Sequence, residues 1–283
     1  AVPPDEIPDR MRAAGHAAKR RQRVLAVGAH PDDVEIGVAG ILIANRAAGN
    51  ETAVLTLTCG AEGGERAERA REARAAAEHL GAELYLRDLT DTEISEGQPT
   101  VAVIEEVIEA FDPTIVYTHS VHDNHQDHRN TSLASTVACR KVPRLYCYQS
   151  PSATVDFRPT LFVGIDDYLD GKMKAIETYS SQYAIREYLE PDLIRATARY
   201  WGRLGPSRYA ESLEVVRDRT GVVGADHSES AEPAVRGRGA PGIAPAPGAG
   251  SVPGAGEVAA SGEVPGAGGA VVDAAARTGE TSV

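Results

Sequence analysis

A histidine and two adjacent carboxylates stand together near the start of this sequence. Residues 29–33 read Ala-His-Pro-Asp-Asp and close an apolar run at residues 24–29. Such a run is typical of a buried parallel strand, and ligands of an open α/β sheet bind at the carboxyl ends of its strands. His30, Asp32 and Asp33 would bring metal-type ligands and a base to one point. Because neighbouring carboxylates repel unless a cation or donors compensate, the stretch predicts half of a metal site.

A second polar cluster lies much further along the chain. Residues 119–128 hold four of the eight histidines, at a constant spacing of three. On one helix, the directions of side chains three residues apart differ by about 60°, so His119 and His128 would face opposite sides. We therefore expect a loop at a strand end, followed by a helix that begins near residue 127 or 128. His125 and His128 can then both point into a cleft, with Asp127 as a candidate to orient a histidine ring by a hydrogen bond.

Together the two clusters offer the ligands of a catalytic zinc site, which are two imidazoles and a carboxylate with one open position. His30 and Asp33, with one histidine of the second cluster, supply that set. A simpler interpretation is that Asp32 or Asp33 caps the following helix. The metal site is favoured because both clusters follow predicted strands of one sheet and so share an edge.

The elements that must position these residues alternate between strand and helix. The predicted strands are residues 24–29, 52–58, 83–86, 114–118, 145–148 and 161–165. The predicted helices are residues 35–48, 65–80, 100–111, 128–139, 168–179 and 191–204, before an amphipathic segment at residues 209–217. This alternation implies right-handed βαβ units. We predict a single α/β domain, Rossmann-like, with a mainly parallel β-sheet and helices on both faces.

The two ends of the chain differ from this middle part. Residues 1–22 contain many Pro, Asp and Arg residues and are interpreted as an N-terminal arm. Residues 223–283 are rich in Gly, Pro and Ala and have no aromatic residue. Such a composition buries too little apolar surface to offset ordering entropy, which predicts a disordered C-terminal tail. The catalytic domain is therefore expected at residues 23–222.

Composition excludes several classes of partner. The formal net charge of −12 lacks the basic footprint that nucleic acids and anionic membrane surfaces require. The longest apolar stretch, at residues 37–44, is far too short for a membrane span. Cys59, Cys139 and Cys147 have unrelated spacings, which predicts buried or free thiols in a reducing compartment. We expect a cytoplasmic protein that acts on a small molecule.

At this point the two motifs resemble those of a known enzyme family. Residues 29–35, Ala-His-Pro-Asp-Asp-Val-Glu, are similar to the AHPDD(x)E signature of the LmbE/PIG-L family of zinc-dependent N-deacetylases. Residues 125–128, His-Gln-Asp-His, are similar to its second motif, HPDH, with Gln126 where proline is common. The resemblance covers about residues 23–219.

The resemblance implies a role for each matching residue. The residues that match the ligands of a single zinc ion are His30, Asp33 and His128. Asp32 matches the general base, and His125 matches the histidine that polarises the amide carbonyl or stabilises the oxyanion. Arg66 is similar to an arginine that contacts the sugar or its anionic substituent. Arg69 and Glu72 resemble the family's RxxE helix, for which we expect a structural role.

The main functional hypothesis is a zinc-dependent hydrolase that removes an N-acyl group, usually acetyl. Its substrate would be an amino-sugar conjugate or glycosylated natural product, hydrolysed by Asp-assisted attack of metal-bound water on the amide. His119 and His122 are additional histidines, so a different third ligand stays open.

Two alternatives come from other classes of protein. A metal-dependent phosphoesterase could use the same His/Asp cluster, but it would need a second metal and more carboxylates. The candidates for those carboxylates, which have no obvious pairing, are Asp88, Asp91 and Asp123. A non-catalytic sugar-binding α/β module is disfavoured, because no GxGxxG turn follows the first strand and two carboxylates would repel a phosphate.

Overall fold

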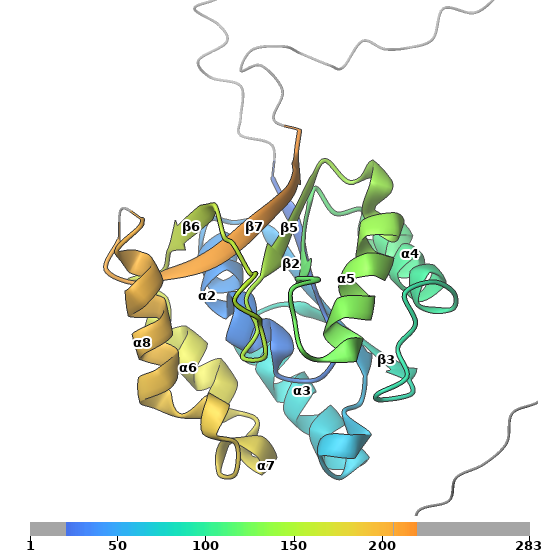
Figure 1. Ribbon diagram of the computed structural model, residues 1–283, viewed down its shortest axis with the longest axis horizontal. Helices are drawn as coiled ribbons and strands as arrows, with labels where there is room; N and C mark the ends of the chain where they lie inside the picture. Colours follow the sequence, from blue (N-terminus) through green and yellow to red (C-terminus); the bar gives the residue numbers. More distant parts are fainter. Residues whose placement is uncertain (1–20, 206, 220–283) are drawn as a thin grey trace, which may run out of the picture. The chain divides into compact units, whose positions relative to one another are not determined.

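The computed structural model describes residues 21–205 and 207–219 (Figure 1). The predicted tail at residues 223–283 and nearly all of the predicted arm at residues 1–22 lie outside the described residues. Within the described part, seven strands form one sheet in the order β3-β2-β1-β4-β5-β7-β6. The strands are β1 (Arg23–Gly28), β2 (Glu51–Thr58), β3 (Glu83–Leu89), β4 (Ile115–His119), β5 (Arg144–Tyr148), β6 (Leu161–Gly164) and β7 (Ala210–Asp218).

The sheet is mainly parallel, as the alternation of elements predicted. The five strands from β3 to β5 pair in parallel, whereas β7 runs antiparallel to both β5 and β6. Strand β1 has β2 on one side and β4 on the other, so the direction of winding reverses there. In α/β sheets the crevice at such a switch point is where ligands bind.

Helices cover both faces of the sheet. One face carries α2 (Asp33–Ala47), α3 (Arg66–Leu80), α6 (Leu169–Glu177), α7 (Ser180–Tyr183) and α8 (Pro191–Gly202), and the other carries α4 (Thr100–Phe111) and α5 (Gln126–Ala138). Figure 1 shows α6 and α8 at the left and α4 and α5 at the right. In β1, Val24 and Ala26 pack in the core under α2 and α6, whereas Leu25 and Val27 pack in the core under α4 and α5. This alternation is the period of two of a strand buried on both sides.

The predicted strands and helices up to residue 204 occur, with ends that differ by a few residues. Gly81 ends α3 in the left-handed conformation, with a φ of 63°. The amphipathic segment at residues 209–217 forms strand β7 between β5 and β6. The short elements α7, η3 (Ala61–Gly63), η4 (Cys139–Lys141) and η5 (Glu187–Leu189) were not predicted.

Helix α2 has a break in its middle that fixes its first turn. Val38 has non-helical dihedral angles, with φ −143° and ψ 18°. A Cβ at Gly37 would lie 2.3 Å from the ring of Tyr148, so only glycine permits this contact. The Tyr148 hydroxyl donates a hydrogen bond to the carbonyl of Val27 at 2.9 Å. The first turn of α2, which begins at Asp33, is therefore held against β1 and β5.

A buried ion pair occupies the break. The Nζ of Lys172 donates to the carbonyl of Ile36 and to the carboxylate of Glu211, each at 2.6 Å. Glu211 also accepts the backbone N–H groups of Gly40 at 3.0 Å and Ile41 at 2.8 Å. In an unbroken α-helix the Ile36 carbonyl would accept from the Gly40 N–H. Side chains from α6 and β7 thus bind backbone groups that would otherwise be buried without a partner.

The described helices are all too short or too polar to cross a lipid bilayer. The three cysteines are buried and free, as their spacing predicted.

Candidate metal centre and active site

The two sequence motifs meet in a cavity of about 390 Å³ at the carboxyl ends of β1 and β4. These strands are parallel neighbours, so the loops that follow them lie side by side although they are far apart in the sequence. The motif residues that line the cavity are His30, Asp32, Asp33, His125 and His128. The expectation that both motifs share one edge of the sheet is confirmed.

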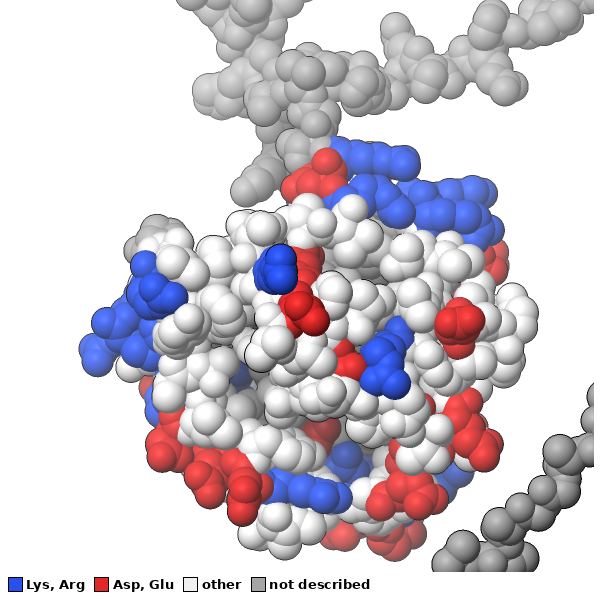
Figure 2. All heavy atoms as spheres, viewed as in Figure 1, with Lys and Arg blue, Asp and Glu red and all other residues white. Residues whose placement is uncertain are grey.

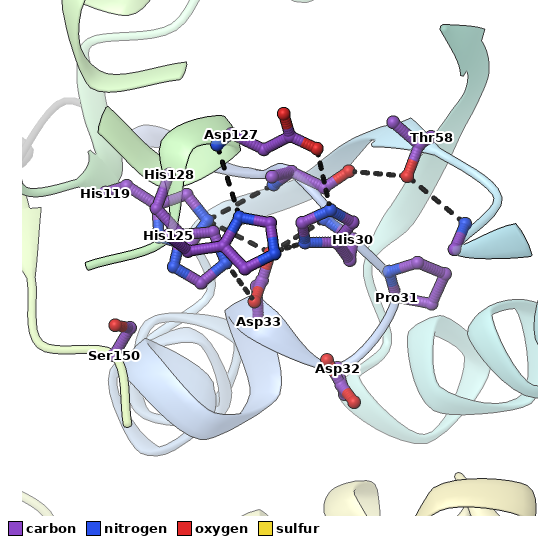
Figure 3. Close-up of polar contacts among 12 residues, drawn as sticks. His30, Pro31, Asp32, Asp33, Thr58, His119, His125, Asp127, His128 and Ser150 are labelled. Atoms are coloured by element: carbon purple, nitrogen blue, oxygen red, sulfur yellow. Dashed lines mark hydrogen bonds and ion pairs between the residues drawn. The ribbon is translucent and has the colours of Figure 1, made fainter. Parts of the chain in front are cut away.

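The structure brings together His30, Asp33 and His128, the three residues predicted as metal ligands (Figure 3). One ligand atom from each residue lies within 4.8 Å of the other two. His30 Nδ1 is 3.4 Å from one carboxylate oxygen of Asp33, and His128 Nε2 is 3.3 Å from the other. Two imidazole nitrogens and a carboxylate are a donor set that zinc prefers, so the residues present fit such an ion.

The opposite nitrogen of each histidine is bound to a buried carboxylate. His30 Nε2 lies 3.0 Å from Asp91 Oδ1 and 3.1 Å from Asp127 Oδ2. His128 Nδ1 lies 3.0 Å from Asp123 Oδ2. Such partners fix the orientation and tautomer of a ring and leave its other nitrogen for a metal. The sequence could not specify the ring that Asp127 orients, and the structure identifies it as His30.

Backbone groups hold two of these carboxylates in place. Asp127 accepts the N–H groups of Thr92 at 2.8 Å and Ile94 at 3.2 Å. Asp91 accepts the N–H of Glu62 at 2.9 Å. The loops after β2 and β3 are therefore connected to the site. The sequence did not predict that Asp91 contacts His30, because the two residues lie in loops that are far apart in the sequence.

Asp123 is fully engaged by donors and is suited to orienting His128. It accepts from the hydroxyls of Ser150 and Ser152 and from the backbone N–H of His125. Burial raises the pKa of Asp123, but His128 and the two serines outweigh burial and hold the pKa well below its ordinary value. A carboxylate with so many donors has little capacity left to bind a metal.

The charges of the site favour a bound cation. Burial lowers the pKa of His128, but the carboxylates of Asp33 and Asp123 outweigh burial and raise the pKa to about 9. Burial raises the pKa of Asp33, but His128 and His119 lower it well below its ordinary value. The same negative potential that holds a proton on His128 would attract a divalent ion.

Asp32 differs from Asp33 in both backbone and surroundings. It lies at the N-cap of α2 with a φ of 97°, which is uncommon for a residue other than glycine, and it makes no side-chain cap. Its Oδ2 is buried, has no hydrogen bond within the described chain, and lies 3.5 Å from Nη2 of Arg69. Burial raises the pKa of Asp32 to about 7, although Arg69 opposes this. Figure 3 shows its side chain directed away from the Asp33 network.

The two arginines of α3 lie in different environments. Arg66, the predicted sugar contact, is not among the residues lining the cavity. It is 55% exposed and pairs with Asp88 on the surface. Arg69 lines the cavity and donates to the carbonyl of Pro31 at 2.7 Å. Its Nε and Nη1 have no hydrogen-bond partner among the described residues. Arg69, for which a structural role was expected, therefore lies at the cavity, whereas Arg66 does not.

Glu72 has the structural role expected for it. Its carboxylate accepts from the hydroxyl of Ser180 at 3.0 Å and from the backbone N–H and hydroxyl of Ser181 at 2.8 and 2.7 Å. These bonds join α3 to α7.

His125 lines the same cavity as the three predicted ligands. It is the N-cap residue of α5, and its Nδ1 accepts the backbone N–H of Asp127 at 3.2 Å. A neutral ring with Nδ1 as acceptor carries its proton on Nε2. Burial lowers the pKa of His125, and the charges of His128 and His30 lower it further, which favours the neutral form. His125 can therefore donate a hydrogen bond from Nε2.

The two additional histidines differ in their burial. His119 is fully buried behind His128, with ring centroids 3.9 Å apart, and its Nε2 is 3.0 Å from Asp33. Burial lowers the pKa of His119 to about 4, so the ring is neutral. It forms a possible ligand group with Asp123 and His128, but Asp123 is already engaged. His122 is exposed and belongs to none of the ligand groups among the described residues.

Comparison with known proteins identifies the class of protein. Residues 25–139 match the PIG-L family, described as GlcNAc-PI de-N-acetylase. A protein of Escherichia coli (strain K12), described as uncharacterized deacetylase YaiS, is 31% identical over 174 residues, covering 58% of this chain and 94% of YaiS. The chain therefore belongs to the PIG-L (LmbE-like) family, and it is a hydrolytic N-deacetylase.

Two further proteins share this similarity. The diacetylchitobiose deacetylase of Thermococcus kodakarensis is 28% identical over 223 residues, covering 69% of this chain and 83% of that protein. The crystal structure of the conserved protein TT1542 from Thermus thermophilus superposes with a TM-score of 0.63 at 26% identity, covering 71% of this chain and 97% of that one.

Proposed function

We propose that this enzyme uses one zinc ion to hydrolyse the N-acyl amide of an amino-sugar conjugate or glycosylated natural product. One arrangement carries the proposal. The predicted ligands His30, Asp33 and His128 converge, and the same cavity is lined by Asp32, whose buried Oδ2 accepts no hydrogen bond from the described residues. A metal site with a base beside it is what the attack of water on an amide requires. The similarity to a diacetylchitobiose deacetylase supports an amino-sugar substrate.

In this proposal each side chain has a defined role. His30, Asp33 and His128 would hold the ion. When bound, such an ion lowers the pKa of water from 15.7 to about 7 and polarises a carbonyl. Asp32 accepts a proton from the attacking water through its carboxylate. The water oxygen then bonds to the acyl carbon, the C–N bond breaks, and the proton on Asp32 passes to the leaving amine.

His125 would stabilise the charge that develops on the carbonyl oxygen. Its Nδ1 accepts the backbone N–H of Asp127, so the proton on Nε2 is available to a group outside helix α5. One donor of this kind typically contributes about 2.7–4 kcal/mol to lowering the barrier. Asp127 thereby positions two histidines, since its carboxylate also binds His30.

Many of the other side chains that line this cavity are polar, which suits a sugar. Its lining includes Glu62, Arg69, Thr92, Gln182 and Arg186. These side chains offer donors and acceptors to sugar hydroxyls, and Arg69 has N–H groups without partners in the described chain. Figure 2 shows that the lower half of this face is hollowed, with acidic and basic atoms inside the hollow.

The phosphoesterase alternative requires a second cluster of ligands. Besides His30, Asp33 and His128, the described residues offer two ligand groups, His30–His125–Asp127 and His119–Asp123–His128. The carboxylates of these two groups, Asp127 and Asp123, already accept hydrogen bonds from other groups. Of the extra carboxylates considered, Asp88 is exposed and pairs with Arg66, whereas Asp91 and Asp123 are bound to His30 and His128. The geometry therefore supports a site for one metal ion.

The test is a hydrolysis screen over N-acetylglucosamine conjugates with added zinc, with free amine as the readout. We expect amine release that stops on chelation, returns with zinc, and is absent in Asp33→Ala. p-Nitrophenyl phosphate is the control substrate. Its turnover in place of amide hydrolysis, or two metal ions per chain, would contradict the proposal.

A further inference from the structure

A second cavity, of about 180 Å³, borders the one that holds the metal site. Three residues line both cavities: Ile36, Pro151 and Tyr188. Ile36 lies in the first turn of α2, where its backbone N–H donates to the carbonyl of Asp32 at 3.0 Å. The second cavity therefore begins one helical turn from the proposed base.

Tyr188, on η5, lies in the wall between the cavities. The residue lines the cavity that holds the metal site as well as the second cavity. A substrate that occupies both cavities would pass beside Tyr188.

The second cavity is apolar on the side formed by α8. The apolar residues of that wall are Leu193, Ile194, Ala198 and Trp201, and Thr197 lies among them. The indole N–H of Trp201 is bound to Gln149 at 2.7 Å. Leu193 is 48% exposed, so apolar surface continues to the edge of the molecule.

The charged groups of this cavity are already paired. Lys172 and Glu211 line its inner side, but they bind each other and the backbone of α2. They offer no free charge to a ligand. Ser212 also lines the cavity, and its buried hydroxyl has no partner among the described residues. This hydroxyl could bind one polar atom of an otherwise apolar group.

The size of the cavity limits its occupant. An apolar cavity of about 150 Å³ binds benzene, so this one has room for a chain of about six carbons. An acetyl methyl group would leave most of it unfilled.

We propose that this second cavity binds the acyl chain of the substrate, so that the enzyme prefers N-acyl amino sugars with chains of about four to eight carbons over N-acetyl ones. The inference rests on the proposed function. The scissile amide joins a polar sugar to an apolar acyl group. The metal site lies in a cavity lined by many polar side chains, and this cavity borders a second one with an apolar wall on α8. Hydrolysis releases a short fatty acid and a free amino sugar, with water as the co-reactant.

The first experiment measures kcat/KM of the zinc-loaded enzyme for methyl glycosides of N-acetyl-, N-butanoyl- and N-hexanoylglucosamine. Each buried methylene contributes about fourfold, so we expect the hexanoyl substrate to exceed the acetyl one at least about tenfold. The octyl glycoside of N-acetylglucosamine is the control substrate, because it carries its apolar group on the glycosidic oxygen and not on the acyl group.

The outcomes separate this inference from the proposed function. Equal values across the acyl series, or a gain only for the octyl glycoside, would overturn the acyl-chain assignment and leave N-deacylation in place. Release of amine from none of these substrates would overturn both.

Variants test whether the gain arises in this cavity. Ala198→Leu fills it from the buried side of α8, and Thr197→Trp covers it from the exposed side. Both should move the hexanoyl-to-acetyl ratio of kcat/KM toward one. Ala196→Trp, on the same helix but outside the lining, is the matched control and should keep the ratio. A ratio that persists in both filled variants would refute the assignment.

Discussion

Lys172 and Glu211 form a buried ion pair across the break in helix α2, with Nζ and Oε1 2.6 Å apart. Their side chains are only 5% and 2% exposed. Lysine binds the carbonyl on one side of the break and glutamate binds the N–H groups on the other. The first turn of α2, which begins with Asp33, therefore depends on residues from α6 and β7.

We expect Glu211→Gln and Lys172→Met each to lower the free energy of unfolding by about 3–5 kcal/mol, because each leaves a buried charge or backbone group without its partner. Urea denaturation measures this loss. Asp170→Asn is the control. Asp170 lies on α6, like Lys172, and its exposed pair with Arg195 of α8 should contribute less than about 1 kcal/mol. A similar small loss for Glu211→Gln would show that the pair is dispensable.

Replacing Asp32 and Asp33 in turn should separate the base from the ligand. Asp32→Asn should retain zinc and lower kcat about 10²–10⁴-fold, because it removes proton transfer only. Asparagine also tolerates the positive φ at this position, so the backbone should persist. Asp33→Asn should instead lose zinc. Elemental analysis and kcat measured on the same preparations decide this, and normal turnover in Asp32→Asn would exclude the base role.

Asp123→Asn should weaken zinc binding about 10–100-fold, because Asp123 holds the tautomer and orientation of the proposed ligand His128. The measurement is the zinc Kd by competition with a chromogenic chelator. Circular dichroism checks that the variant is folded. Asp156→Asn, an exposed carboxylate outside the cavity, is the matched control. An unchanged Kd in Asp123→Asn would show that His128 needs no such partner.

The two arginines of α3 should respond differently to truncation. Arg69→Ala should lower kcat/KM by about tenfold or more, since a hydrogen bond to a charged group contributes about 1.5–3 kcal/mol. Arg66→Ala removes only a surface pair and should change kcat/KM less than about twofold. Melting temperatures of both variants separate a substrate effect from loss of structure. A larger loss of kcat/KM in Arg66→Ala than in Arg69→Ala would instead support Arg66 as the sugar contact.

The buried thiols predict a specific pH dependence of alkylation. Burial raises the pKa of both Cys139 and Cys147 to about 12. A raised pKa keeps each thiol protonated below that pH, and only the thiolate is reactive. Iodoacetamide at pH 8 should therefore leave both unmodified in the folded protein and modify them in urea, as mass spectrometry would show. Rapid native modification at pH 8 would contradict their burial.

The sequence by itself determined most of the layout of the fold, because the signals that carry it are local. Apolar runs such as residues 24–29 mark buried strands, and Gly81 ends α3 through its own backbone conformation. His30 and Asp33 stand three residues apart, so one turn of chain places them together. A histidine of the second motif could be added because neighbouring parallel strands share an edge, and the family resemblance specified His128.

Tertiary structure decided the features that depend on contacts between distant segments. The helical pattern of α3 does not reveal which arginine faces the cavity, and only packing of α3 against the sheet distinguishes Arg66 from Arg69. Strand β7 pairs with β5 and β6 through long-range register, which an amphipathic nine-residue segment cannot reveal. Tyr188 lines the cavity of the metal site although it lies far from both motifs in the sequence. No local rule of spacing predicts contacts of this kind, because they depend on how segments distant in the sequence pack against one another.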